Sequence, residues 1–305
     1  MTTHHSPNAV ATGAEAAARP CRLGHLPEAR AETARDTTAL VIGTQRRPIT
    51  YADLADLVVD QCAALQRSGL RPGDVVALQS TNSIAFVVGL FAAARADLVV
   101  APIDPALPSA ERQTRVDMVG ARVTLTDAHQ QFRGASTPDH PAWLLQTADD
   151  SSSHGKPALR LVISDPPRAV KSPLPGLTDQ DALIMFTSGT TGKPKIVPWT
   201  HNNIAAALAG IADGYQLGPS DATVAVMPLF HGHGLIAGLL ATLATGGRVV
   251  LPARGRFSAH TFWDDLAAVD ATWYTAVPTI HQILLDRAPT DLPGGHRGRL
   301  FHPQL

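Results

Sequence analysis

The chain has 305 residues, enough for one large domain or two smaller ones, and 45% of them are hydrophobic, which is sufficient for a substantial core. The net charge of −1 argues against binding of nucleic acid through a basic surface, and the longest apolar runs, 85–94 and 235–244, are too short to cross a bilayer. The two cysteines, Cys21 and Cys62, do not suggest a disulfide framework and favour the cytoplasm.

The first part of the chain alternates predicted helices and strands. Residues 1–30 include an Ala-, Thr- and His-rich start without a signal-peptide pattern, and we predict a disordered N-terminal tail there. Apolar spacing then predicts helices over 53–65 and 84–95, the second beginning near Asn82 or Ser83, and buried strands over 75–78, 98–101 and 123–126. This alternation favours a parallel sheet with helices on its faces.

A Pro-, Ser-, Asp- and Gly-rich stretch, residues 130–180, interrupts the series, with one strand predicted at 159–163. We interpret it as a boundary between a first α/β lobe, residues 31–175, and a second, residues 176–305. The elements predicted for the second lobe are strands over 182–187, 223–227, 248–251 and 272–276 and helices over 202–212, 233–244, 259–268 and 279–286.

A polar loop follows the first strand of the second lobe. Residues 187–195 read Thr-Ser-Gly-Thr-Thr-Gly-Lys-Pro-Lys. Glycines allow positive φ and close approach of amide groups to a ligand, while hydroxyls and lysines bind anionic oxygens. This combination favours a polyphosphate-binding loop over an ordinary surface turn. The candidate binding residues are Thr187, Ser188, Gly189, Thr190, Thr191, Gly192 and Lys195.

The loop differs from the Walker A pattern, since Thr187 and Pro194 stand where that pattern needs glycine and a hydroxyl residue. Continued to His201, it resembles instead the signature of the adenylate-forming superfamily, which includes acyl-CoA synthetases, firefly luciferase and peptide-synthetase adenylation domains. The match departs at Ile196, where the family usually has glycine; a β-branched residue resists positive φ, so we expect Ile196 to weaken the loop if that geometry is needed.

Three further segments resemble family motifs in the family's order, so that the resemblance runs from about residue 35 to about residue 290. They are residues 49–54, residues 73–105 with the turn Pro102-Ile103-Asp104-Pro105, and residues 227–235, Met-Pro-Leu-Phe-His-Gly-His-Gly-Leu.

The resemblance implies an α/β fold: the large N-terminal domain of adenylate-forming enzymes, with layered parallel-type sheets and helices on both faces. It implies an ATP-dependent acid–CoA ligase (acyl-CoA synthetase) of cytoplasmic fatty acid metabolism, which uses ATP, Mg²⁺ and coenzyme A to activate a carboxylic acid as an acyl-adenylate. The loop would bind the β- and γ-phosphates. The acyl pocket would be lined by His231, Gly232 and Gly234, with His231 near the substrate carboxylate.

The family's later motifs are a Tyr-Gly-x-Thr-Glu segment that helps to hold Mg²⁺, a ribose-binding Asp and a C-terminal adenylation lysine. None is found up to Leu305. We therefore expect a truncated synthetase, incomplete at the C-terminus, to which we assign no catalytic residue and for which a separate chain could supply the C-terminal domain. The alternatives are an inactive nucleotide-binding remnant or interaction module, and an adenylation domain that feeds a carrier protein.

Two other interpretations of the region after residue 230, a metal site and a dinucleotide site, are less favoured. His231 and His233 form a His-x-His pattern, but no cysteine or carboxylate lies near at ligand spacing, so we predict no metal site. The glycines at 232, 234 and 238 imitate a dinucleotide fingerprint, but their spacing differs and no acidic residue ends the next strand. We expect close packing of the helix against a strand to explain these glycines.

Overall fold

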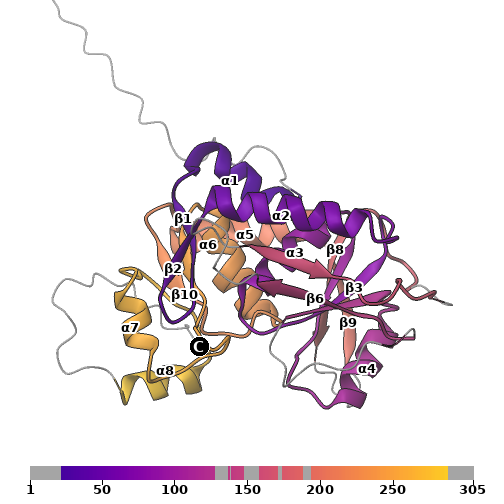
Figure 1. Ribbon diagram of the computed structural model, residues 1–305. Coiled ribbons are helices and arrows are strands. Elements are labelled where there is room, and N and C mark those ends of the chain that lie inside the picture. The colour runs from indigo at the N-terminus through magenta and orange to yellow at the C-terminus, as the bar shows by residue number, and fades with distance from the viewer. Residues whose placement is uncertain are drawn as a thin grey trace, which may run out of the picture.

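The computed structural model describes residues 22–127, 137, 139–147, 158–170, 174–187 and 194–287. Its strands form two sheets, with helices around and between them (Figure 1). The strands are β1 (Thr38–Ile42), β2 (Arg47–Thr50), β3 (Val75–Gln79), β4 (Val99–Pro102), β5 (Val123–Thr126), β6 (Ala142–Thr147), β7 (Leu159–Val162), β8 (Asp181–Thr187), β9 (Lys195–Thr200), β10 (Ala222–Val224) and β11 (Arg248–Val250). The helices are η2 (Leu23–His25), α1 (Leu26–Ala34), α2 (Tyr51–Gln66), α3 (Ile84–Arg95), α4 (Ser109–Met118), α5 (His201–Tyr215), the π-helix η4 (His233–Leu240), α6 (Ala241–Ala244), α7 (Phe262–Ala267) and α8 (Pro278–Leu285).

The larger sheet has the strand order β7-β6-β5-β3-β4-β8-β9. Its five inner strands are parallel, and its two edge strands, β7 and β9, are antiparallel to their neighbours. The parallel strands β3, β4 and β5 are joined through the helices α3 and α4, the usual crossover for this direction of pairing. The predicted α/β class with a parallel-type sheet is therefore confirmed.

Both faces of this sheet are buried, and the alternation of side chains shows why. Val76, Leu78 and Val100 face a large first core that contains α3, whereas Val75 and Val99 face a separate core closed by α4. Because successive side chains of a strand point to opposite faces, an apolar run such as Val75–Leu78 can be buried on both sides. Burial on both sides explains why residues 75–78 are all apolar.

The smaller sheet has the order β10-β11-β1-β2, with β1 antiparallel to β2 and parallel to β11. One face shares the first core with the larger sheet, through residues such as Leu40 and Val249. The other face forms a second core with α7 and α8, through Val41, Val250 and Phe262. Helices α7 and α8, in yellow, lie beside this sheet, away from β6 and β7 (Figure 1).

Most predicted elements are present, with shifts of a few residues at their ends. Helix α3 has the predicted bounds, and the Ser83 side chain caps it by accepting a hydrogen bond from the Phe86 amide. The predicted disordered tail does not extend over residues 23–30, because Leu23 and Leu26 are buried and begin two helices. The lobe boundary at residue 175 stays a prediction; each sheet takes strands from both sides of it.

The strand predicted over 272–276 does not form. The amides of Thr272 and Trp273 both donate to the carbonyl oxygen of Ala222, so this segment lies beside β10 without a regular ladder. Conversely, β9 was not predicted, because Pro198 lies in its middle. It forms at the edge of the sheet, where its partner β8 lies on one side only.

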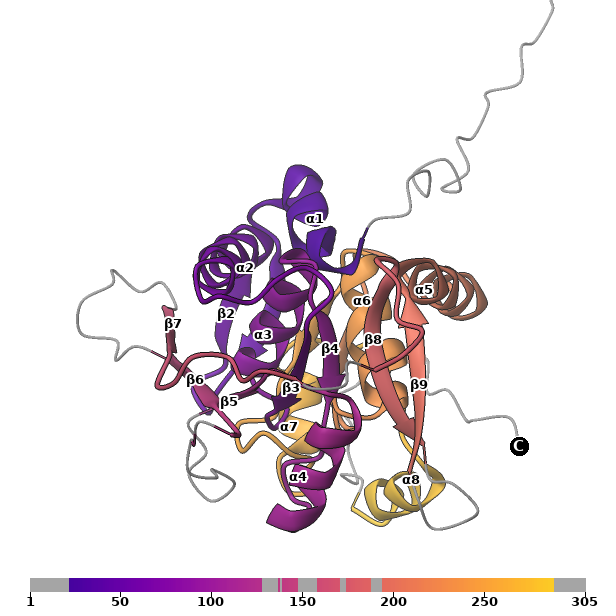
Figure 2. The ribbon, with the colours of Figure 1, turned by 90° about the vertical axis from the view of Figure 1, so that its right-hand side faces the viewer.

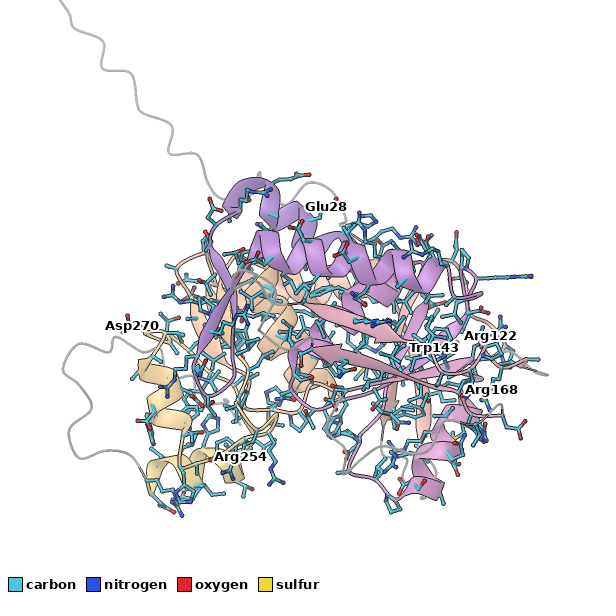
Figure 3. The ribbon with its side chains drawn as sticks, viewed as in Figure 1. Glu28, Arg122, Trp143, Arg168, Arg254 and Asp270 are labelled. Atoms are coloured by element: carbon cyan, nitrogen blue, oxygen red, sulfur yellow. The ribbon has the colours of Figure 1, made fainter. Side chains whose placement is uncertain are left out.

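The segment after β7 is tied to the sheet by two arginines, which lie close together in Figure 3. The Arg122 guanidinium donates to the Arg168 carbonyl oxygen and to Asp74, while that of Arg168 donates to the Ala121 carbonyl oxygen and to Asp117. Among the residues that the structure describes, no helix is both long and apolar enough for a membrane span.

Candidate functional site

The predicted phosphate loop connects β8 to β9 at one end of a hairpin. Strand β8 ends at Thr187 and β9 begins at Lys195, and these two residues are directly opposite each other in the ladder. Both are exposed. Ser188, Gly189, Thr190, Thr191 and Gly192 lie outside the described residues, so only the two ends of the loop are placed. Figure 2 shows β8 and β9 side by side with α5 next to them.

Thr187 and Lys195 point to the same side of the hairpin, because residues that are directly opposite share a face. Ile184, Phe186 and Ile196 pack together in the core on the side of α4. Met185 and Thr187 alternate with Ile184 and Phe186, so they lie on the other face. The side chains of Thr187 and Lys195 thus project from the face of the β8–β9 hairpin that carries Met185.

The turn that carries His231 lies over this same face. A β-carbon on Gly232 would be 4.0 Å from the methyl carbon of Met185. The backbone of His231 is fixed within the turn, since its amide donates to the Pro228 carbonyl oxygen and its carbonyl oxygen accepts from the Leu235 amide. Its side chain is exposed and its ring lies 4.8 Å from that of Phe230, centre to centre. The structure therefore brings His231 and the loop ends to one face of β8.

Gly234 is the second residue of η4, and close packing excludes a side chain there. A β-carbon there would lie 2.3 Å from the carbonyl oxygen of Pro228 and 2.7 Å from that of Met227. The expected helix–strand packing is not what excludes a side chain at Gly234, where the close contact is with the preceding turn. At Gly238 a β-carbon would have only ordinary contacts, so the expected packing is not confirmed there either.

His233 points to a different partner from His231. Its Nε2 lies 2.5 Å from the hydroxyl of Thr275, which sequence reasoning did not single out because nothing local connects positions so far apart in the chain. Burial, followed by the charge of nearby His281, lowers the pKa of His233. His281 in turn contacts the Tyr274 hydroxyl through Nδ1, at 3.1 Å. The contact with Thr275 connects the start of η4 to the segment before α8.

The site lies at the edge where the parallel strands of the larger sheet end. Strands β3, β4, β5 and β8 run in the same direction, so the loops after them meet at their carboxyl ends. Ligands of open α/β sheets bind outside this edge. The loop after β3 reaches the His231 turn directly: the Asn82 side chain donates to two carbonyl oxygens of residues 225–229 and accepts from the Leu229 amide.

Three residues of the signature have other surroundings. Ile196 lies in β9 opposite Phe186 and is not among the described residues with positive φ. A β-branched side chain is therefore compatible with the strand backbone at this position. Trp199 packs at the edge of the first core. His201 lies beyond the far end of β9 from the loop; its Nδ1 accepts from the Leu23 amide. Within the described ranges, no three His, Cys, Asp or Glu side chains gather as a metal site.

Comparison with known proteins identifies relatives that include CoA ligases and peptide synthases. Over 244 residues, the chain is 41% identical to an oxalate–CoA ligase of Arabidopsis thaliana, an alignment that covers 78% of this chain and 47% of that protein. It is 33% identical over 281 residues to a sulfoacetate–CoA ligase of Cupriavidus necator, covering 90% of this chain and 53% of that protein. The chain thus spans about half the length of these relatives.

The fold agrees with solved structures of similar proteins. The ATP-bound structure of MatB from Rhodopseudomonas palustris superposes with a TM-score of 0.68 at 21% identity, covering 91% of this chain and 53% of that one. At this identity the likeness shows the fold alone. The family model of AMP-binding enzymes matches residues 27–300, almost the whole of the described chain. The chain therefore belongs to the AMP-binding enzyme family.

Proposed function

We propose that this chain forms the nucleotide- and acid-binding part of an ATP-dependent acid–CoA ligase. The observation that carries the proposal is a shared face of the β8–β9 hairpin: Thr187 and Lys195, at the ends of the glycine-rich loop, lie on the face of Met185, and the turn of His231 approaches Met185 at Gly232. An ammonium group and a hydroxyl suit phosphate oxygens. An imidazole beside them suits a carboxylate.

The chemistry follows from bringing two anions together. The acid carboxylate attacks the α-phosphorus of ATP, an acyl-adenylate forms and pyrophosphate leaves. This step needs the repulsion between carboxylate and polyphosphate to be offset and both to be held in line. Lys195 would offset charge on the leaving phosphates, Thr187 would donate a hydrogen bond, and His231 would orient the carboxylate. A thiol such as that of coenzyme A then takes the acyl group and AMP leaves.

The proposal implies Mg²⁺, because the nucleotide substrate would be the Mg²⁺ complex of ATP. The described residues include no carboxylate cluster of the kind that a hard cation prefers. We therefore assign it no protein ligand among them and derive no step from it. Bound with ATP, it would supply further positive charge at the phosphates.

We also propose a substrate class of short acids with a second anionic group. Two of the relatives are named as ligases of oxalate and of sulfoacetate, and both acids are two-carbon carboxylates with a second acidic group. Both are therefore the first acids to test.

Isothermal titration of the chain with MgATP, and separately with oxalate and sulfoacetate, tests the proposal. We expect saturable binding of MgATP, weakened at least tenfold by Lys195→Ala, because the substitution removes a charge at the loop. Arg67→Ala, an equal loss of charge at the exposed end of α2, is the matched control and should leave the affinity unchanged. Absence of binding at millimolar MgATP would overturn the proposal.

A further inference from the structure

The side chain of Asn82 bridges two parts of the molecule that are far apart in sequence. It lies in the loop between β3 and α3 and is 3% exposed. Its amide nitrogen donates to the carbonyl oxygens of Ala225 and Met227, at 2.9 and 3.0 Å. Its amide oxygen accepts from the Leu229 amide at 2.9 Å. Both donor hydrogens and one acceptor site are thus used on a single segment, 225–229.

This segment leads directly into the turn that carries His231. Only one residue separates Leu229, which is fully buried, from His231. The amide of His231 donates to Pro228, which lies inside the bridged segment. A shift of residues 227–229 would therefore move the backbone of His231 with it.

The loop of Asn82 is itself held firmly. The backbone amide of Asn82 donates to the Gly255 carbonyl oxygen at 2.8 Å. The neighbouring Ser80 hydroxyl donates to the buried carboxylate of Asp127 at 2.6 Å, and Ser83 caps α3. Asn82 therefore connects a rigid part of the larger sheet to a segment that leaves the smaller sheet after β10.

We propose that Asn82 is a positioning residue for the carboxylic acid substrate: it holds residues 225–229 so that His231 faces the carboxylate. The proposal rests on the proposed function, since it assigns His231 to the acid. Asn82 does not contact the substrate. Its amide is suited to the role because one planar group supplies two donors and an acceptor, a combination that aspartate and leucine of similar size lack.

The first test compares the affinities of Asn82→Ala for acid and for nucleotide, by titration well below the unfolding temperature. We expect the affinity for the acid to fall at least tenfold and the affinity for MgATP to change less than twofold, because Thr187 and Lys195 are held by β8 and β9. Thr50→Ala is the matched control: it also removes a helix cap, that of α2, but its capping partner is Asp53 and not the loop of Asn82 or residues 225–229. It should leave both affinities unchanged.

The second test measures hydrogen exchange at the Leu229 and His231 amides. In Asn82→Ala both should exchange at least tenfold faster, while amides of β3 stay protected. Asn82→Gln, which keeps the same groups one methylene further out, should restore part of the protection and of the acid affinity.

An equal loss of both affinities would show a general structural role and overturn the proposal, as would an unchanged affinity for the acid. If the unaltered chain binds MgATP but no acid, the acid-binding part of the proposed function fails. The exchange rates then still decide whether Asn82 holds the segment.

Discussion

At the scale of single residues, the glycines of the His231 turn illustrate how the structure separates similar positions. Gly232, Gly234 and Gly238 occur in one short stretch of sequence, but only Gly234 faces backbone oxygens at a distance that excludes a β-carbon. A side chain can move away from a new methyl group, whereas the carbonyl groups of Met227 and Pro228 are part of a bridged segment. Gly234 is therefore the position at which a minimal substitution is most informative.

We expect Gly234→Ala to lower the free energy of unfolding by about 1–3 kcal/mol, because the new methyl group overlaps the Pro228 carbonyl oxygen. Gly210→Ala is the matched control, since Gly210 lies inside α5 with nothing near its β-position. This substitution should raise stability by about 0.5–1 kcal/mol, the usual gain in a helix. Urea midpoints of the two variants check both signs, and an equal effect would contradict the close contact.

At the scale of elements, two helices begin in the same way, directly from the last residue of a strand. Thr50 ends β2 and caps α2 with Asp53, and Thr200 ends β9 and caps α5 with Asn203. In each capping box the threonine hydroxyl accepts a hydrogen bond from the backbone amide of the third helical residue. The side chain of that third residue accepts a hydrogen bond from the backbone amide of the threonine. The strand is thereby turned into a helix without an intervening loop.

We expect Thr50→Ala and Thr200→Ala each to lower the free energy of unfolding by about 0.5–2 kcal/mol, the usual cost of a lost N-terminal cap. Thr→Ser at either position keeps the hydroxyl and should retain most of the stability. Thermal unfolding of the four variants tests this expectation. A serine variant as unstable as the alanine variant would mean that the methyl group, and not the cap, matters.

Prediction from sequence succeeded for elements whose signal is local. Helix α3 and strands β3, β4 and β5 were found from apolar runs and caps, since both faces of β3 and β4 are buried. It failed for the 272–276 strand and for β9, where the outcome depends on a neighbour. The first has no regular partner at β10, whereas β9 has β8 as a partner and tolerates Pro198 at the sheet edge.

At the scale of the whole molecule, pH should act through two histidines whose pKa is lowered. Burial, then the charge of Arg22, lowers the pKa of His201, whose Nδ1 accepts a hydrogen bond from Leu23. Burial also lowers the pKa of His233. The unfolded chain therefore takes up protons near the ordinary pKa of 6.5, at a pH where these native histidines are still neutral.

The unfolding free energy should therefore fall as the pH is lowered through 6.5 towards the depressed native pKa of these histidines. His201→Asn, which can still accept from Leu23, should reduce the loss between pH 7.5 and pH 5.5, about one unit either side of the ordinary histidine pKa. Urea unfolding at the two values measures it. The double variant with His233→Asn should reduce it further. A loss equal to that of the unaltered chain would contradict the role of His201.

The sequence by itself determined the family, the α/β class and the candidate residues of the loop and turn, because these depend on local composition and motif spacing. Only the tertiary structure decided that Thr187, Lys195 and the His231 turn share one face of β8, since this depends on strand register and on a contact between Gly232 and Met185. It also assigned His201 to the helical N-terminal segment, through its hydrogen bond with Leu23. The bridge from Asn82 to residues 225–229 is of the same kind: hydrogen bonds between segments distant in the chain leave no periodic signal in the sequence.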